Sequence, residues 1–183
     1  MNHEEKNPWT RLSTAEIYEN PWIKVEEDQV LKPNGEPGIY GRVHFKNKAI
    51  GIVAIDEVLN TWLVGQYRYT LEEYCWEIPT GGGPLNETPL ESAKRELREE
   101  TGISARSWEN ILRIHTSNSV TDEEGFVFLA KDLSYGDTEF DDTEDLLIKK
   151  MPLKEALDMV MKNEITDSLS IAGLLKVARL LEI

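Results

Sequence analysis

The residues of this chain that could do chemistry lie close together, between a run of glycines and the end of one helical segment. Five glutamates fall between Gly81 and Ile103, and Arg95 stands among them. The positions with fixed spacing are Gly81, Glu87, Arg95, Glu96, Leu97, Glu99, Glu100, Gly102 and Ile103. Because Mg²⁺ prefers carboxylate oxygens and binds bridging phosphate oxygens, this concentration of negative charge indicates a site for a divalent cation.

The spacing places the key acids on one side of a helix. Glu96 and Glu100 lie four residues apart and share a face, and Glu99 borders it. Arg95 can offset the charge of Glu99. The short run Glu-Leu-Arg-Glu-Glu alone would suit an ordinary solvated helix, but chance explains the full spacing poorly. The glycines at 81–83 would let the backbone turn sharply and approach the acids closely.

The helix that carries these acids has clear ends in the sequence. Thr88 and Glu91 form a capping box, Pro89 suits the first helical position, and Gly102 supplies the C-terminal stop. Leu90, Ala93 and Leu97 would pack one side of the helix on a sheet.

The rest of the chain alternates between short strands and helices, which predicts a mixed α/β sandwich. We expect a flexible tail at 1–13, a small antiparallel β unit at 14–46 and a main domain at 47–183. The expected strands lie near 23–30, 40–45, 49–55, 62–65, 74–78, 110–116, 125–130 and 146–148, and the further helices at 152–161 and 168–181.

Composition narrows the class of protein. The 183 residues carry a net charge of −14, and this acidic balance argues against an extended nucleic-acid groove. No apolar run is long enough to span a membrane, and the N-terminus lacks the features of a signal peptide. The single cysteine, Cys75, is compatible with a reducing cytoplasm and reads as a small buried hydrophobe.

At the Gly81–Ile103 pattern the sequence resembles the Nudix hydrolases. Their shared motif, the Nudix box, has this spacing, and every specified position of it matches. The resemblance implies a Nudix-type α/β/α sandwich with a mixed sheet, preceded by a small N-terminal antiparallel β unit. It also implies Mg²⁺, with Mn²⁺ possible, held directly by Glu96 and Glu100. Glu99 would bind metal directly or through water, and Thr80 would offer its carbonyl, although many relatives carry alanine or glutamate there.

The resemblance assigns further roles within the box. Arg95 would orient the acids, Glu87 would brace the loop, and Gly81 and Gly102 are structural. In this family a glutamate in a loop after the box is typically the general base that activates water. Glu144 is our choice, and Glu139 and Asp142 in the same acidic loop are the alternatives.

Flanking segments narrow the resemblance to the ADP-ribose pyrophosphatase branch, which acts on nucleoside diphosphate sugars. They are the segments 64–69, 76–79, 117–130 and 143–153. In that branch homodimers are usual, and the N-terminal unit helps to form the interface. The implied reaction is metal-dependent hydrolysis of the pyrophosphate bond, which yields a nucleoside monophosphate and a sugar phosphate.

Four residues outside the box are candidates for substrate binding. Arg68 could clamp a phosphate, since guanidinium pairs bidentately with phosphate, or form a surface salt bridge. Glu123 could contact substrate or metal. Trp22 and Tyr40 could stack on a base, or simply pack. We read Trp76, His44 and His115 as structural.

Two other functions stay open. One is a nucleotide-sugar sensor that binds without hydrolysis, although a pure sensor has no need of every acid. The other is removal of diphosphate from RNA 5′ ends, which the acidic balance makes less attractive. The sequence does not identify the preferred base or sugar.

Overall fold

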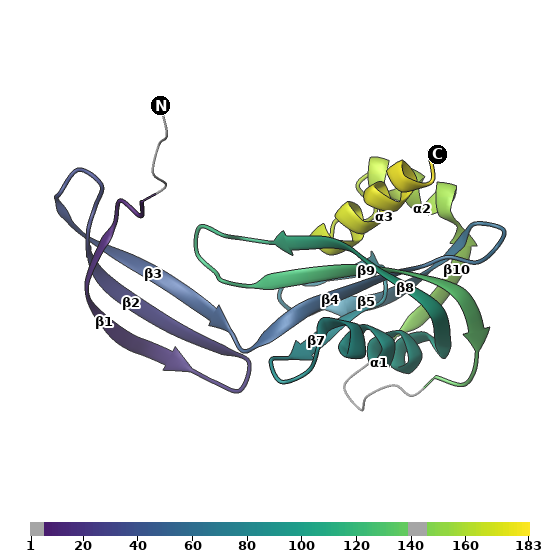
Figure 1. Ribbon diagram of the computed structural model, residues 1–183, viewed down its shortest axis with the longest axis horizontal. Coiled ribbons are helices and arrows are strands. Elements are labelled where there is room, and N and C mark those ends of the chain that lie inside the picture. The colour runs from purple at the N-terminus through teal and green to yellow at the C-terminus, as the bar shows by residue number, and fades with distance from the viewer. Residues whose placement is uncertain (1–5, 139–145) are drawn as a thin grey trace. The chain divides into compact units, whose positions relative to one another are not determined.

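The computed structural model describes residues 6–138 and 146–183. Two compact units emerge from its backbone contacts (Figure 1). One comprises Met1–Asn47 with Ser117–Glu123, and the other comprises Lys48–Thr116 with Glu124–Ile183. No helix among the described residues has the length and apolar character needed to cross a bilayer.

The first unit is a three-stranded antiparallel sheet in the order β1-β2-β3. Its strands are β1 (Thr10–Glu19), β2 (Ile23–Leu31) and β3 (Pro37–Phe45). Strand β1 was not expected: it begins inside the segment assigned to a tail at 1–13 and adds a third strand to the expected hairpin. The prediction failed because every residue of β1 is exposed, so no buried face imposes the alternation that marks a strand.

The second unit contains two sheets and all three helices. One sheet has the order β10-β5-β6 and the other β7-β4-β9-β8. Strand β4 runs parallel to β9, whereas β8 runs antiparallel to it, so the sheet is mixed as expected. The elements are β4 (Asn47–Ala54), β5 (Asn60–Arg68), β6 (Glu73–Glu77), β7 (Thr80–Pro84), α1 (Pro89–Thr101), β8 (Ile103–His115), β9 (Glu124–Tyr135), β10 (Leu147–Pro152), α2 (Leu153–Met161) and α3 (Ser168–Leu180).

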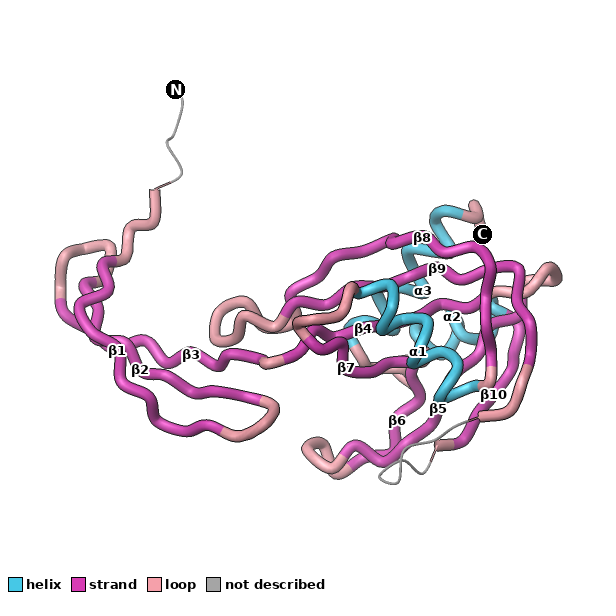
Figure 2. Tube along the Cα trace, turned by 60° about the horizontal axis from the view of Figure 1, so that its bottom comes forward, coloured by secondary structure: helices cyan, strands magenta, loops and turns pink. Residues whose placement is uncertain are grey.

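The helices of the second unit cover opposite faces of its sheets. Helix α1 lies on one side, and α2 and α3 lie on the other, as the two views of Figures 1 and 2 show. Each side has its own apolar core. Ala93 and Leu97 of α1 pack on Ile50 and Ile52 of β4, and a larger cluster lies beneath α2 and α3. The expected α/β/α sandwich is confirmed.

The boundaries of α1 match the capping signals in the sequence. The Thr88 hydroxyl accepts a hydrogen bond from the Glu91 N–H at 3.3 Å, and the Glu91 carboxylate accepts one from the Thr88 N–H at 2.9 Å. Gly102 ends the helix with φ of +68°, a conformation that glycine adopts at little cost. Both ends of α1 are therefore fixed, and with them the positions of its acidic residues.

Two strands differ from expectation. Strand β7 runs through Gly81–Gly83, which we expected to be a loop, because pairing with β4 overrides the low β propensity of glycine. Strand β8 begins at Ile103, directly after the helix stop, rather than near residue 110. As a result, the glycine run lies in a regular strand beside α1.

Candidate active site

The backbone of Gly81 forms a cradle for the carboxylate of Glu96. A Cβ added at Gly81 would lie only 2.0 Å from the carboxyl carbon of Glu96 and 2.1 Å from one of its oxygens. No other residue type fits without moving that carboxylate. The first glycine of the pattern is thus needed because β7 and α1 bring a metal-ligand candidate against the bare backbone.

Glu100 is the most deeply buried acid of the helix, with 1 % of its surface exposed. Its Oε2 accepts a hydrogen bond from the backbone N–H of Thr80 at 3.0 Å. This bond ties the beginning of β7 to the last turn of α1. Glu96 is also buried, at 7 % exposed, so the two acids predicted to bind metal share a shielded position behind the glycine strand.

Arg95 connects the acids of α1 to strand β7. Its Nη1 donates to Glu96 at 2.7 Å and to Glu99 at 3.0 Å, and its Nη2 donates to the Gly82 carbonyl at 3.0 Å. Glu87 lies 3.7 Å from the same guanidinium and accepts a hydrogen bond from the Ser92 hydroxyl at 2.9 Å. This arrangement supports the orienting role expected for Arg95 and the bracing role expected for Glu87.

Arg68 forms a salt bridge with Glu77, and 39 % of its side chain stays exposed. Its Nε donates to Glu77 Oε1 at 2.9 Å, its Nη2 bonds Glu77 Oε2, and Nη2 also contacts the Thr80 hydroxyl at 3.3 Å. The hydrogen bond to Glu77 is the main cause that raises the pKa of Arg68, and the nearby charges of Asp167 and Glu100 add to it. Arg68 is therefore close enough to Glu100 of α1 to interact with its charge.

The sequence analysis did not identify Glu77 as part of this site. Its carboxylate is buried, with 3 % of the residue exposed. A signal was present: Glu77 falls two positions after the buried Cys75 in β6, so strand alternation puts it on the same side of the strand. Burial also raises the pKa of the Cys75 thiol, in keeping with its expected inert role.

The balance of charge in this region fits a divalent cation. Glu77, Glu96 and Glu100 are all buried, and Arg68 and Arg95 are the guanidiniums that contact this group. Buried carboxylates are costly unless cations or hydrogen-bond donors compensate them. The described residues contain no ready-made cage of three or more acidic, His or Cys ligands. Mg²⁺ does not require one, because it keeps several waters and uses one or two carboxylates.

Three of the predicted substrate residues belong to the first unit. Trp22 is 66 % exposed, so it does not pack within the described chain. The Tyr40 hydroxyl donates to the Ser119 carbonyl at 2.8 Å, and its ring meets Trp9 edge-on. His44 bonds Asp122 and Glu26 within this unit, which fits the structural role expected for it. Glu123 ends the 117–123 segment. Substrate contact by Trp22, Tyr40 and Glu123 stays a prediction.

The predicted general base falls outside the described residues. Glu139, Asp142 and Glu144 all lie within 139–145. The assignment of Glu144 therefore rests on the sequence resemblance alone.

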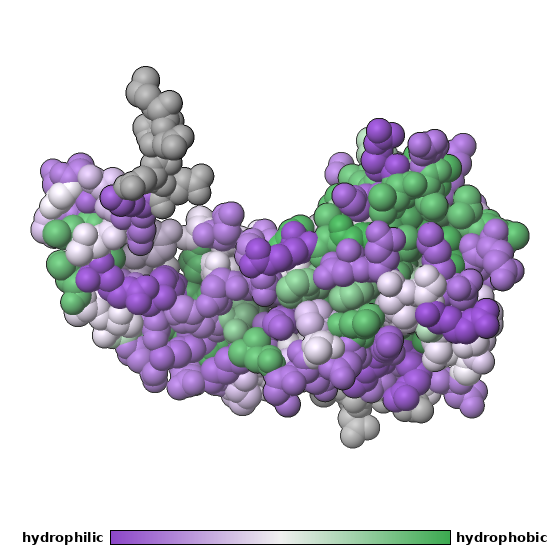
Figure 3. All heavy atoms as spheres, viewed as in Figure 1, coloured by the Kyte–Doolittle hydropathy of each residue, from purple (hydrophilic) through white to green (hydrophobic). Residues whose placement is uncertain are grey.

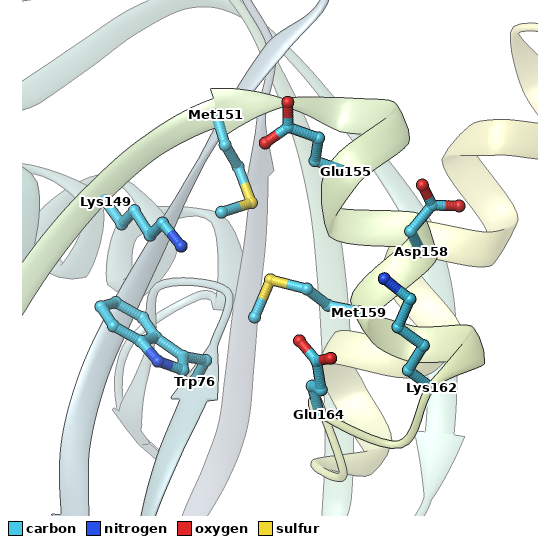
Figure 4. A pocket seen from close by; sticks show the side chains of 8 residues that line it. All are labelled: Trp76, Lys149, Met151, Glu155, Asp158, Met159, Lys162 and Glu164. Atoms are coloured by element: carbon cyan, nitrogen blue, oxygen red, sulfur yellow. The ribbon is translucent and has the colours of Figure 1, made fainter.

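A cavity of about 540 Å³ lies between strands β6 and β10 and helix α2 (Figure 4). Trp76 of β6, Met151 of β10 and Met159 of α2 supply its apolar lining. The Lys149 ammonium lies 5.5 Å from the centre of the Trp76 ring. None of the box residues lines it, so this cavity contributes nothing to the metal site. Trp76 also packs partly against the larger core, consistent with a structural role.

Comparison with known families gives two matches along the chain. Residues 9–43 match the model of the nucleoside diphosphate sugar hydrolase N-terminal domain, and residues 46–168 match the NUDIX domain. These matches meet close to the boundary between the first unit and the start of β4.

Individual proteins resemble the chain over most of its length. An ADP-ribose pyrophosphatase of Mycobacterium tuberculosis is 36 % identical, covering 91 % of this chain and 81 % of its own. An ADP-ribose pyrophosphatase of Bacillus subtilis is 31 % identical, covering 86 % and 85 %. A crystal structure of an ADP compounds hydrolase superposes with a TM-score of 0.87 over 98 % of this chain and 97 % of its own, at 23 % identity.

Proposed function

The chain belongs to the NUDIX family of hydrolases, and from this premise we propose that it hydrolyses the pyrophosphate bond of nucleoside diphosphate sugars, with ADP-ribose as the first candidate substrate. The NUDIX domain by itself does not specify a substrate. The observation that carries the proposal is the nucleoside diphosphate sugar hydrolase N-terminal domain directly ahead of it. The products are a nucleoside monophosphate and a sugar phosphate.

The chain's own residues supply the binding and orientation for this reaction. Glu96, Glu100 and Glu99, with the Thr80 carbonyl, would hold Mg²⁺, and Mn²⁺ is the alternative. A bound divalent metal neutralises the diphosphate and lowers the pKa of water. Arg95 orients Glu96 and Glu99 and offsets the repulsion between them, since its Nη1 bonds both carboxylates. Arg68 faces the diphosphate, and Glu144 takes the proton of the attacking water.

The proposal is tested with purified protein and a panel of nucleoside diphosphate sugars, with nucleotide and phosphate products identified. We expect turnover of ADP-ribose that requires Mg²⁺ or Mn²⁺ and stops with a chelator. Glu100→Gln should abolish metal-dependent turnover, and its circular dichroism should match that of the wild type. Release of neither product from any compound would refute the activity, and wild-type turnover by Glu100→Gln would refute the metal role.

We also propose that the chain forms a homodimer through its first unit. Strand β1 is exposed along its whole length, and Leu12, Ile17 and Trp22 are 58 %, 61 % and 66 % exposed. Figure 3 shows apolar patches on the surface of this unit. A three-stranded sheet with so little buried surface gains stability by burying such side chains against a second copy. Trp22 and Tyr40 of this unit stay candidates for substrate contact. Sedimentation equilibrium should give twice the chain mass, and a monomer at micromolar concentration would refute this.

The two alternatives make different predictions. A sensor would bind ADP-ribose tightly without turnover across several metals. An RNA 5′ pyrophosphohydrolase would prefer a triphosphorylated oligonucleotide in direct competition with ADP-ribose. The buried acids of the box favour catalysis over sensing, because a sensor does not need them all. A cytoplasmic location stays a prediction from the single cysteine.

A further inference from the structure

The orientation of Arg68 is set by a buried acid that the catalytic pattern does not include. Glu77 accepts from both Nε and Nη2 of Arg68, which is the paired geometry of a guanidinium fork on a carboxylate. The Glu77 side chain is 4 % exposed and that of Arg68 is 39 % exposed. The acid is thus the fixed partner, and the arginine reaches from it toward solvent.

Thr80 connects this ion pair to the box. Its hydroxyl accepts from Arg68 Nη2 at 3.3 Å and donates to Glu77 Oε2 at 3.4 Å. Its backbone N–H donates to Glu100 at 3.0 Å. One residue at the beginning of β7 therefore touches the ion pair with its side chain and a predicted metal ligand with its backbone. All four residues belong to the second unit.

The bonds to Glu77 and Thr80 leave the Nη1 group of the guanidinium for a ligand. They use Nε and Nη2, and Nη1 has no hydrogen-bond partner within 6–138 and 146–183. A guanidinium has five N–H donors in one plane, so fixing one edge also fixes the direction of the remaining donors. Nη1 is therefore the part of Arg68 that could donate to a phosphate oxygen.

We propose that Glu77 and Thr80 are positioning residues: Glu77 fixes the plane of Arg68, and the Thr80 hydroxyl holds this pair in register with Glu100, so that Nη1 meets the substrate diphosphate. This inference rests on the proposed function. It gives the Thr80 side chain a role distinct from that of its carbonyl. It also predicts that the hydroxyl matters for diphosphate binding more than for folding.

Thr80→Val is the sharpest variant, because it removes the hydroxyl, keeps similar volume and preserves the N–H that bonds Glu100. Loss of these bonds to a charged partner should raise the KM for ADP-ribose by about fivefold to tenfold, with a smaller change in kcat. Thr80→Ser, the matched control, keeps the hydroxyl and should restore KM to within about twofold of wild type. Failure of the serine variant to restore KM would overturn the proposal.

A double-mutant cycle separates positioning from structure. If Thr80 acts through Arg68, Thr80→Val should change KM by less than about twofold when Arg68 is already lysine, because the two effects are coupled. Independent, additive effects would overturn the proposal. Glu77→Gln should raise the KM for ADP-ribose more than Thr80→Val does. If Glu77→Gln does not fold, the cycle with Thr80 still decides the question.

Binding of α,β-methylene-ADP with Mg²⁺, measured by calorimetry, gives the same comparison without turnover. Weaker binding by Thr80→Val, together with wild-type affinity in Thr80→Ser, supports the positioning role. This holds even if the protein hydrolyses no nucleotide sugar, because absence of hydrolysis would refute only the proposed activity. Equal affinity of the wild type and Thr80→Val, or no binding by either, would overturn this inference. In urea unfolding without metal, Thr80→Val and Thr80→Ser should have similar free energies of unfolding.

Discussion

Gly81→Ala should disable the carboxylate site and leave the fold nearly intact. The added Cβ would lie 2.0 Å from the Glu96 carboxyl carbon, whereas ordinary contact begins at 3.4 Å. The carboxylate must therefore move by more than about 1 Å. The colliding group is the end of a flexible side chain, and its bond to Arg95 would have to be rearranged. We expect the free energy of unfolding of the metal-free protein to fall by only about 1 kcal/mol.

The effect on catalysis should be much larger than the effect on stability. A misplacement of about 1 Å at a reacting site costs about 10²-fold in rate, and disturbed support of a ligand costs about 10- to 100-fold in metal affinity. We expect kcat/KM for ADP-ribose to fall by about 10²-fold, equivalent to about 2.7 kcal/mol. The Mg²⁺ concentration for half-maximal activity should rise with it.

The assay is a Mg²⁺ titration of ADP-ribose hydrolysis beside urea unfolding of the metal-free protein. Gly136→Ala is the control, because its Cβ would lie 3.5 Å from the Gly102 carbonyl, an ordinary contact. It should match the wild type in both measurements. If Gly81→Ala retains turnover within about threefold and needs no more Mg²⁺ than the wild type, the Glu96 cradle is not part of the active site.

Three further predictions concern the cap of α1, the contacts of Arg95 and the Asp56 turn that precedes β5. Thr88→Ala breaks the capping box and should cost about 1 kcal/mol in urea unfolding, with kcat at saturating Mg²⁺ unchanged; a change of less than about 0.3 kcal/mol would contradict the capping role. In Arg95→Lys the ammonium cannot bond Glu96, Glu99 and the Gly82 carbonyl at once, so the Mg²⁺ affinity measured by calorimetry should fall about tenfold. Unchanged affinity would refute the orienting role of Arg95. Burial tends to raise the pKa of Asp56, but hydrogen bonds from Asn60 and Lys150 lower it to about 2. A lowered folded pKa gives stability at higher pH that is lost as pH falls through about 2, so the stability gap between wild type and Asp56→Asn should narrow between about pH 5 and pH 2; a constant gap would contradict this.

Local signals in the sequence were sufficient for the helix that carries the acids. Thr88, Glu91 and Gly102 specify its ends through short-range hydrogen bonds and backbone preference, so no distant contact was needed to place it. The spacing of Glu96 and Glu100 follows from the helical repeat alone. The metal-binding character of the segment was therefore readable before its surroundings were known.

Strand β1 shows where local signals fail. Its side chains are all exposed, so its structure depends on backbone pairing with β2, a contact between different parts of the chain. The prediction also failed for the glycine strand β7, because the composition of this segment gives no sign that it pairs with β4. Glu77 was missed for a related reason: a lone acid in a strand acquires meaning only when Arg68 and Thr80 are brought beside it.

The sequence by itself determined the class of chemistry, since residue type and helical spacing put the acids of one box on one segment. Tertiary structure decided what surrounds those acids: Gly81 against Glu96, Thr80 against Glu100, and Arg68 turned by Glu77. The physical reason is range. Helix caps and side-chain spacing act over a few residues, whereas burial, charge compensation and the aim of a guanidinium depend on strands that meet only in the folded chain.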